Sequence, residues 1–386
     1  MTVNAKKWPD RLYALDVSRG VAALSVVIWH WQHFAYQGGA LTKGFEQNTM
    51  PLFSLLQLFY EMGHAGVQYF FLLSGFVFFW LYKKPIRNRE ILPTTFFLQR
   101  FSRLYPLHFV TLLVVALLQL LFISHEGNFF VYPFNDINNF ILHLGFANAW
   151  SSSSVMSFNA PAWSVSIEVL LYCLFFPIVL RFNCSWFVCI LISIVVYIFN
   201  IFSPQLLFPA LSIFYYGGFI FHLTNAISEK NITLTYPIAL LTCLLWVLVV
   251  CHFYLADINE LVQVSDIQPI QFLYSLFSPL FSDYVLFPLT IVSLALIEIN
   301  RGHFLKRMSW IGDITYSSYM LHFPLQLCCA LAVSYGILES SFYLSPISLV
   351  VFFLILILLS RVVFKNFERP VQSYIRRKFS HPITQR

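Results

Sequence analysis

Long apolar runs separated by short polar stretches repeat along almost the whole chain. A transmembrane helix needs about 20 mostly apolar residues. Runs of this kind occupy ten ranges: 14–35, 63–82, 104–124, 163–181, 185–202, 206–223, 235–255, 281–299, 314–336 and 344–365. The apolar range 137–150 is weaker, so we expect it to lie re-entrant or at the membrane interface. The pattern predicts an all-α, polytopic membrane protein of about ten transmembrane helices.

The amino-acid composition is typical of a protein embedded in a lipid bilayer. Of 386 residues, 59% are hydrophobic and 10% are charged, whereas soluble domains carry about 25% charged residues. The first apolar run lacks a small-residue cleavage site and is followed by further runs, so we expect a retained helix. The seven cysteines lie in or beside apolar runs without the spacing of metal ligands. We therefore expect neither a metal site nor a disulfide framework.

The basic residues follow the alternation of the expected spans. If the N-terminus is cytoplasmic, all of the 23 Lys and Arg residues except Lys43 lie on or near the cytoplasmic side. By the positive-inside rule, both termini are expected to be cytoplasmic. The net charge of +6 thus reflects topology, and no nucleic-acid partner is expected. We expect one transmembrane domain, 1–370, and a short basic tail, 371–386, that anchors the topology or binds anionic lipid.

Ionisable residues within the first apolar run are costly in lipid and commonly functional. Arg19 and His30 are eleven residues apart, which puts them about 20° apart on one face of a continuous helix and about 16 Å apart along its axis. Arg19 is expected near the cytoplasmic end and His30 in the outer part. A snorkelling arginine and a packing histidine are the alternative. The small side chains of Ala22, Ala23 and Val26 on the same face favour the close approach of a ligand.

Two further stretches carry charged side chains at the expected spans. The stretch "LQRFSRLYPLHF" (98–109) places Arg100 and Arg103 on one helical face, and paired guanidinium groups suit phosphate oxygens. Topology alone is the alternative explanation of these arginines. The stretch "APAWSVSIEVLLYCLFF" places Glu168 at a depth similar to that of His30. A histidine beside a carboxylate is a common general base near neutral pH.

Polar side chains also occur in two other apolar stretches. In "GHAGVQYFFLLSGF" (63–76), three glycines are costly in a helix unless a backbone or a ligand comes near, and Ser74 places a hydroxyl near mid-membrane. In "YSSYMLHFPL" (316–325), Tyr316, Tyr319 and His322 lie on adjacent turns near the inner half of the expected span.

These stretches, taken in order, resemble the acyltransferase-3 family of integral membrane O-acyltransferases, which modify extracytoplasmic sugars. Residues 15–30 resemble the opening of the family, in which a basic residue, ten intervening residues and a histidine form the hallmark, here Arg19 and His30. Four later motifs match at 66–76, 100–106, 163–172 and 316–324. The resemblance covers essentially the full length and is to the single-domain members. Two positions depart from the family: Gln68 stands where Asp is frequent, and His64 replaces a second glycine.

The resemblance implies a multi-pass enzyme of the bacterial inner membrane that uses acyl-CoA, most simply acetyl-CoA, as co-substrate, with no tightly bound cofactor. It implies His30 as general base, with Glu168 orienting or acidifying its other nitrogen. The acceptor is expected to be a hydroxyl of a polysaccharide or glycolipid. The expected donor-binding residues are Arg19, Ser74, Arg100, Arg103, Tyr316, Tyr319 and His322, and the expected acceptor-binding residues are Trp163 and His64. The acidic outer loops 36–62, 125–162 and 256–280 are expected to contribute acceptor specificity.

Other functions agree with parts of the sequence. A proton-coupled secondary transporter that exports a sugar would also use buried His and Glu, although the sequence shows no inverted repeat or pair of broken helices. A non-catalytic membrane scaffold for polysaccharide assembly is the third interpretation. For the enzyme, direct transfer and an acyl-histidine intermediate both agree with the sequence. The sugar, its hydroxyl, the length of the acyl group and the oligomeric state are left open.

Overall fold

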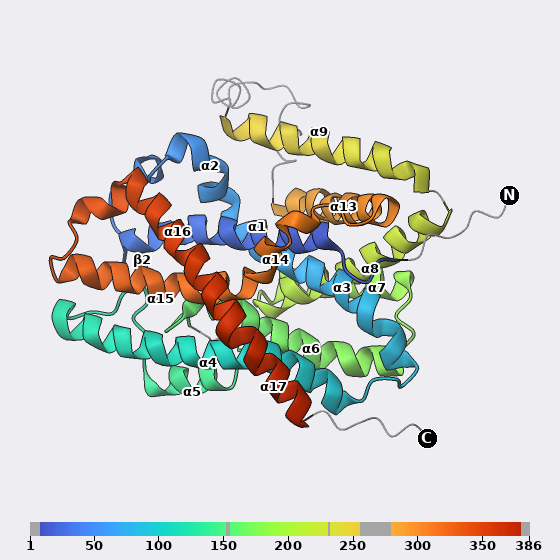
Figure 1. Ribbon diagram of the computed structural model, residues 1–386, viewed down its shortest axis with the longest axis horizontal. Coiled ribbons are helices and arrows are strands. Elements are labelled where there is room, and N and C mark those ends of the chain that lie inside the picture. Colours follow the sequence, from blue (N-terminus) through green and yellow to red (C-terminus); the bar gives the residue numbers. More distant parts are fainter. Residues whose placement is uncertain (1–7, 152–154, 231, 255–278, 380–386) are drawn as a thin grey trace.

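The protein is an all-α bundle, in a computed structural model that describes residues 8–151, 155–230, 232–254 and 279–379 (Figure 1). The α-helices are α1 (Tyr13–Trp29), α2 (Phe53–Met62), α3 (Gly66–Arg87), α4 (Pro93–Glu126), α5 (Ile137–Leu144), α6 (Trp163–Arg181), α7 (Trp186–Phe202), α8 (Leu207–Lys230), α9 (Thr235–Tyr254), α12 (Pro279–Phe281), α13 (Phe287–Arg301), α14 (Trp310–Asp313), α15 (Thr315–Ser334), α16 (Pro346–Val363) and α17 (Arg369–Phe379). Short 3₁₀ helices cover His30–Ala35, Gln47–Thr49, Gly63–Ala65, Ala160–Ala162, Ile232–Leu234, Lys306–Met308 and Ser340–Leu344. The strands β1 (Tyr36–Gln37) and β2 (Ala40–Leu41) form a small antiparallel hairpin.

The helices have the lengths and the apolar surfaces of a multi-pass integral membrane protein. In the part of the chain that the structure describes, seven helical segments are long and apolar enough to cross a membrane. Every one of the ten expected ranges is occupied by a helix, including α1, α7 and α15. Large apolar side chains on α4, α9 and α16, for example Leu117, Leu240 and Leu358, are more than half exposed. Lipid tails are the natural partners of such surfaces. The range 137–150 holds only the eight residues of α5.

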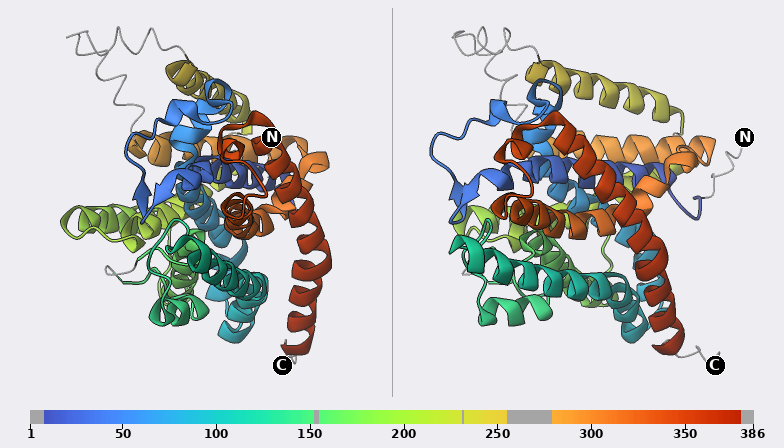
Figure 2. Two further views of the ribbon diagram at one scale, coloured as in Figure 1. Left: turned by 90° about the vertical axis from the view of Figure 1, so that its left-hand side faces the viewer. Right: turned by 60° about the vertical axis from the view of Figure 1, so that its left-hand side comes forward.

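Within the described residues, α1 packs mainly against α2, α3, α13, α14 and α15. In turn, α3 packs against α6 and α8, and α15 packs against α4 and α16. The helix α9 lies at the edge of the bundle opposite α4 and α5, and α16 with α17 runs steeply along the outside (Figures 1 and 2). Side chains on α1 are therefore close to those of α3 and α15, and α6 and α4 pack against these two helices in turn. Together these helices carry most of the expected site residues.

Glycines in these helices make close backbone contacts possible. A Cβ on Gly75 of α3 would overlap the carbonyl oxygen of Phe214 in α8, and a Cβ on Gly66 would lie 2.8 Å from the carbonyl oxygen of Ala22 in α1. Gly20, which follows Arg19 in α1, lies against the backbone of Ile311. Helix packing thus accounts for these glycines, as is usual for small residues in membrane proteins.

Irregular helical segments adjoin three of the long helices. The helix α1 ends at Trp29 and continues as the 3₁₀ helix His30–Ala35, so His30 does not lie on a continuous α-helix with Arg19. A π-helical turn, Ser282–Leu286, precedes α13, and another, Phe364–Glu368, joins α16 to α17. Such irregular turns frequently occur at functional sites.

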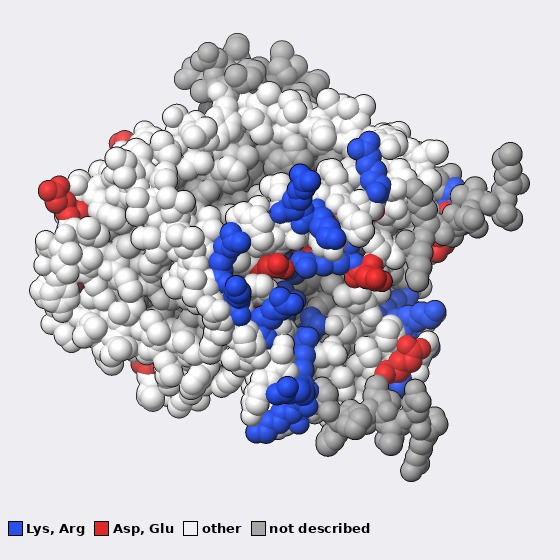
Figure 3. Space-filling model, in the orientation of Figure 1, with Lys and Arg blue, Asp and Glu red and all other residues white. Residues whose placement is uncertain are grey.

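Basic side chains gather on the right-hand half of the face seen in Figure 3, around a hollow that contains acidic side chains. The opposite end of that face carries acidic residues and few basic ones. The helix α17 carries Arg376, Arg377 and Lys378 in its last turn. Of the expected basic tail 371–386, residues 380–386 lie outside the described residues, as do residues 256–278 of the expected outer loop 256–280.

Candidate functional site

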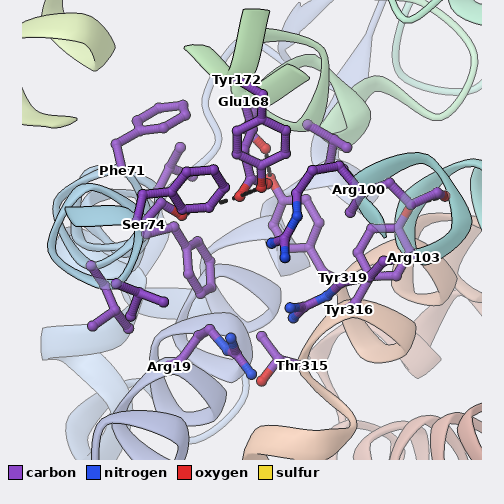
Figure 4. A pocket seen from close by; sticks show the side chains of 18 residues that line it. Arg19, Phe71, Ser74, Arg100, Arg103, Glu168, Tyr172, Thr315, Tyr316 and Tyr319 are labelled. Atoms are coloured by element: carbon purple, nitrogen blue, oxygen red, sulfur yellow. Dashed lines mark hydrogen bonds between the residues drawn. The ribbon is translucent and has the colours of Figure 1, made fainter. Parts of the chain in front are cut away.

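A cavity of about 120 Å³ lies between α1, α3, α4, α6 and α15 (Figure 4). Most of the expected donor-binding residues line it: Arg19, Ser74, Arg100, Arg103, Tyr316 and Tyr319, together with Glu168. These residues are spread over about 300 positions of sequence, and the packing of α1 against its neighbours brings them together. We call this space the arginine pocket.

The three arginines come from two helices and point into the pocket (Figure 4). Arg19 donates from Nη2 to the carbonyl oxygen of Gly312 at 3.2 Å and pairs with Asp16 at 3.3 Å, while its Nε has no hydrogen-bond partner. The guanidinium of Arg100 lies over the rings of Phe78 and Tyr82, and its Nε also has no partner.

Among the described residues, no carboxylate forms an ion pair with Arg100 or with Arg103. A guanidinium has five N–H donors and cannot lose its charge. Half-buried guanidinium groups with unused donors are therefore suited to an anion that enters the pocket.

A second cavity, of about 330 Å³, joins the arginine pocket to the basic face. Arg19, Arg103, Leu73 and Val77 line both cavities. We call it the mouth. Two of the acidic residues at the mouth are paired with one cation: Arg11 contacts Asp16 at 2.5 Å and Asp313 at 2.8 Å.

The position of Arg11 also fixes its protonation. Burial lowers the pKa of Arg11, but hydrogen bonds and charge attraction from Asp16 and Asp313 outweigh burial and raise it above its usual value. Arg11 therefore stays charged and holds α14 against the start of α1.

Glu168 is bound by hydroxyl groups inside the arginine pocket. Ser74 Oγ donates to Oε1 of Glu168 at 3.1 Å, and the hydroxyl of Tyr172 donates to the same oxygen. This differs from the expected pairing of Glu168 with His30. The difference arises because His30 lies beyond the pocket, where another imidazole occupies the position expected for the carboxylate.

His30 pairs with His322. The Nδ1 of His30 lies 2.9 Å from the Nε2 of His322, and the two rings are nearly parallel, with an interplanar angle of 9°. The Nδ1 of His322 lies 2.6 Å from the carbonyl oxygen of Tyr319. His322 was expected to line the donor path with Tyr316 and Tyr319, but it does not line the pocket and contacts the expected base directly.

Additional polar groups surround this histidine pair. His33 stacks on His30 with ring centroids 4.4 Å apart and is bonded to Gln326 at 3.1 Å. The side-chain amide of Gln326 donates to the carbonyl oxygen of His30 at 2.9 Å. Neither His33 nor Gln326 was expected from the sequence. The spacing His30-x-x-His33 in a polar segment was the available signal.

Tyr319 lies between the arginine pocket and the histidine pair. Its side chain lines the pocket, and its hydroxyl bonds to Ser164 Oγ at 2.9 Å and to the carbonyl oxygen of Pro161 at 3.0 Å. Its ring lies 5.7 Å from the ring of His322. One helical turn of α15 therefore connects the wall of the pocket to the histidine pair.

The two expected acceptor-binding residues lie apart from each other. His64 is exposed, and its ring lies 5.7 Å from that of Trp29, which in turn lies 4.9 Å from that of His30. Trp163 begins α6 and lies 6.4 Å from the ring of Phe71 in α3. Neither residue lines the arginine pocket.

Comparison with known proteins gives a family match and two partial relatives. The sequence model of the acyltransferase-3 family, described as an acyltransferase domain, matches residues 12–364. The chain is 33% identical over 120 residues to the acyltransferase MdmB of Streptomyces mycarofaciens, and this aligned stretch covers 30% of this chain and 28% of that protein. It is 33% identical over 108 residues to protein 2 in the picA locus of Rhizobium radiobacter, and this stretch covers 28% of this chain and 46% of that protein. The chain thus spans less than half the length of these relatives, and no solved structure matches it.

Proposed function

This chain belongs to the acyltransferase-3 family and is a multi-pass membrane acyltransferase, and from this premise we propose its donor, acceptor and catalytic base. The donor is cytosolic acyl-CoA, most simply acetyl-CoA. The acceptor is a hydroxyl group of an extracytoplasmic polysaccharide or glycolipid. The base that activates this hydroxyl is His30.

The three guanidinium groups of the arginine pocket support acyl-CoA as the donor. Acyl-CoA carries several phosphate charges at one end and the thioester at the other. Arg19, Arg100 and Arg103 bind the phosphate end, because Arg100 and Arg103 lack a carboxylate partner and Arg19 has an unused donor. The rest of the donor extends past Ser74 and Tyr316 toward Tyr319, all of which line the pocket.

The histidine pair supports the proposed base. His30 is 7% exposed, and its Nε2 has no hydrogen-bond partner among the described residues. This nitrogen takes the proton of the acceptor hydroxyl, and the oxygen attacks the thioester carbonyl. The carbon–sulfur bond breaks, and the CoA thiolate leaves and takes up the proton. An acyl-histidine intermediate uses the same groups, with Nε2 as the first nucleophile.

The observation that carries this proposal is the position of Tyr319, which lines the arginine pocket with its side chain and bonds His322 with its carbonyl oxygen. It joins a cation-lined pocket at one end to an imidazole pair at the other. A donor with an anionic end and a thioester end matches this order.

The direct test uses purified protein in lipid nanodiscs with radiolabelled acetyl-CoA and a bacterial polysaccharide. We expect label in the polysaccharide and release of one free CoA thiol per acyl group transferred. His30→Ala should abolish transfer while binding of acetyl-CoA is retained. Transfer by His30→Ala at the wild-type rate would contradict the assignment of the base, and failure of the wild type to consume any acyl-CoA would contradict the proposed donor.

A further inference from the structure

We propose that His322 is a positioning residue that fixes the tautomer of His30, with the backbone carbonyl of Tyr319 as the end of the hydrogen-bond chain. This inference rests on the proposed function, in which His30 is the base. In many hydrolases a carboxylate holds the catalytic histidine in the required tautomer and orientation. Here an imidazole and a peptide carbonyl take that role.

The chain of hydrogen bonds has one direction because its last member is a carbonyl oxygen. The oxygen of Tyr319 accepts and has no hydrogen to donate. The His322 nitrogen that lies 2.6 Å from it, Nδ1, must therefore carry the hydrogen. In a neutral imidazole the other nitrogen then carries a lone pair. The Nε2 of His322 is consequently an acceptor.

The same reasoning extends to His30. Its Nδ1 lies 2.9 Å from the Nε2 of His322, so Nδ1 of His30 must donate the hydrogen in this bond. The lone pair of His30 then resides on Nε2, the nitrogen without a hydrogen-bond partner among the described residues. The tautomer that a general base needs is thus selected by a carbonyl group on a different helix.

The surroundings hold this chain in place. His322 is completely buried, and Gln326, one turn further along α15, donates to the carbonyl oxygen of His30 at 2.9 Å. When His30 takes a proton on Nε2, its Nδ1–H bond to His322 becomes charge-assisted and stronger. The chain therefore stabilises the protonated state of His30 through a neutral imidazole and a carbonyl oxygen.

The test compares two substitutions of His322. His322→Leu removes the acceptor, so His30 loses its fixed tautomer, and we expect kcat to fall by about 100-fold or more while KM for acetyl-CoA changes by less than about threefold. His322→Gln offers a carbonyl oxygen near the position of Nε2 and should restore kcat to within about tenfold of the wild type.

A matched control is available in α4. His108 is also completely buried, and its Nε2 lies 2.7 Å from a backbone carbonyl oxygen, that of His143. His108→Leu therefore removes a comparable histidine that does not contact His30, and kcat should stay within about twofold of the wild type. A similar loss of kcat in His108→Leu and His322→Leu, or no rescue by His322→Gln, would reduce the role of His322 to packing.

Nitrogen NMR of histidine-labelled wild-type protein in nanodiscs tests the tautomer without any enzyme assay. The signals that disappear in His30→Asn belong to His30, and they should report a protonated Nδ1 and an unprotonated Nε2. The opposite tautomer overturns the inference even if acyl transfer is observed. If no acyl transfer is found but the tautomer is as expected, the proposed function fails and the hydrogen-bond chain stands.

Discussion

The carboxylate of Glu168 shares a pocket with three guanidinium groups and yet receives its hydrogen bonds from Ser74 and Tyr172. A buried carboxylate needs a partner or a proton, and two hydroxyl donors meet that need. Its charge also balances part of the positive charge of the arginines when no anion is bound. Glu168 thus belongs to the donor side of the proposed site, and His322 takes the place beside His30.

Replacing Glu168 tests this division of roles. Glu168→Gln keeps a side-chain oxygen that accepts from Ser74 and Tyr172, and it leaves the histidine pair intact. We expect kcat to fall by less than about tenfold, because the base retains its positioning partner. Steady-state kinetics with acetyl-CoA measures the effect. A loss of kcat as large as that of His322→Leu would restore Glu168 as the partner of His30.

The arginines should govern donor affinity. A hydrogen bond to a charged group contributes about 1.5–3 kcal/mol, and 1.4 kcal/mol corresponds to a factor of about ten in affinity. Arg103→Gln should therefore raise the Kd for acetyl-CoA by about tenfold or more, measured by calorimetry in detergent. Arg307→Gln removes the same charge from an exposed site that lines neither cavity, and it is the control. Equal affinity of both variants for acetyl-CoA would remove Arg103 from the donor site.

At the scale of the helices, close packing decides where the site residues lie. The contact of α3 with α8 depends on Gly75 and Gly217, since a Cβ on Gly217 would overlap the carbonyl oxygen of Leu72. This contact fixes α3, which carries Ser74 beside Glu168. The end of α1 at Trp29 is equally important, because the following 3₁₀ segment turns His30 toward α15.

A single methyl group should loosen the contact between α3 and α8. Gly75→Ala forces the two backbones apart, and overpacking of this kind costs about 1–3 kcal/mol of unfolding free energy. We expect a lower Tm for unfolding in detergent. Gly145→Ala is the matched control, since a Cβ there would lie 3.8 Å from its nearest neighbours, and its Tm should equal that of the wild type. Equal melting of Gly75→Ala and Gly145→Ala would mean that α3 and α8 are free to separate.

Much of this helical arrangement could be predicted from the sequence. Apolar runs located a helix in all ten expected ranges, and the motifs at Arg19, Arg100 and Glu168 supplied one pocket. The pairing of His30 with His322 could not be predicted, because the two residues are 292 positions apart and a histidine in an apolar run does not indicate its partner. Hydropathy also does not show that α1 gives way to six residues of 3₁₀ helix. An α-helix has about 3.6 residues per turn and a 3₁₀ helix about 3.0, and over six residues these two periods give nearly the same pattern.

At the scale of the whole molecule, the basic side chains, the two cavities and the histidine pair follow one another in a fixed order. Basic side chains gather on one face (Figure 3). The mouth and the arginine pocket share Arg19 and Arg103, which point into the pocket (Figure 4). The histidine pair lies beyond Tyr319. The family match favours acyl transfer over the transporter interpretation. With the proposed cytoplasmic orientation of the basic face, acyl-CoA binds from the cytosol and the acceptor reaches His30 from the other side. The soluble donor then never crosses the membrane.

Sealed proteoliposomes test this central claim most directly. Radiolabelled acetyl-CoA is placed either inside or outside the vesicles, and the polysaccharide acceptor is always outside. The account predicts label on the acceptor when acetyl-CoA is inside and none when both substrates are outside, because each molecule accepts its two substrates from opposite faces. Efficient transfer with both substrates on the same side would contradict it.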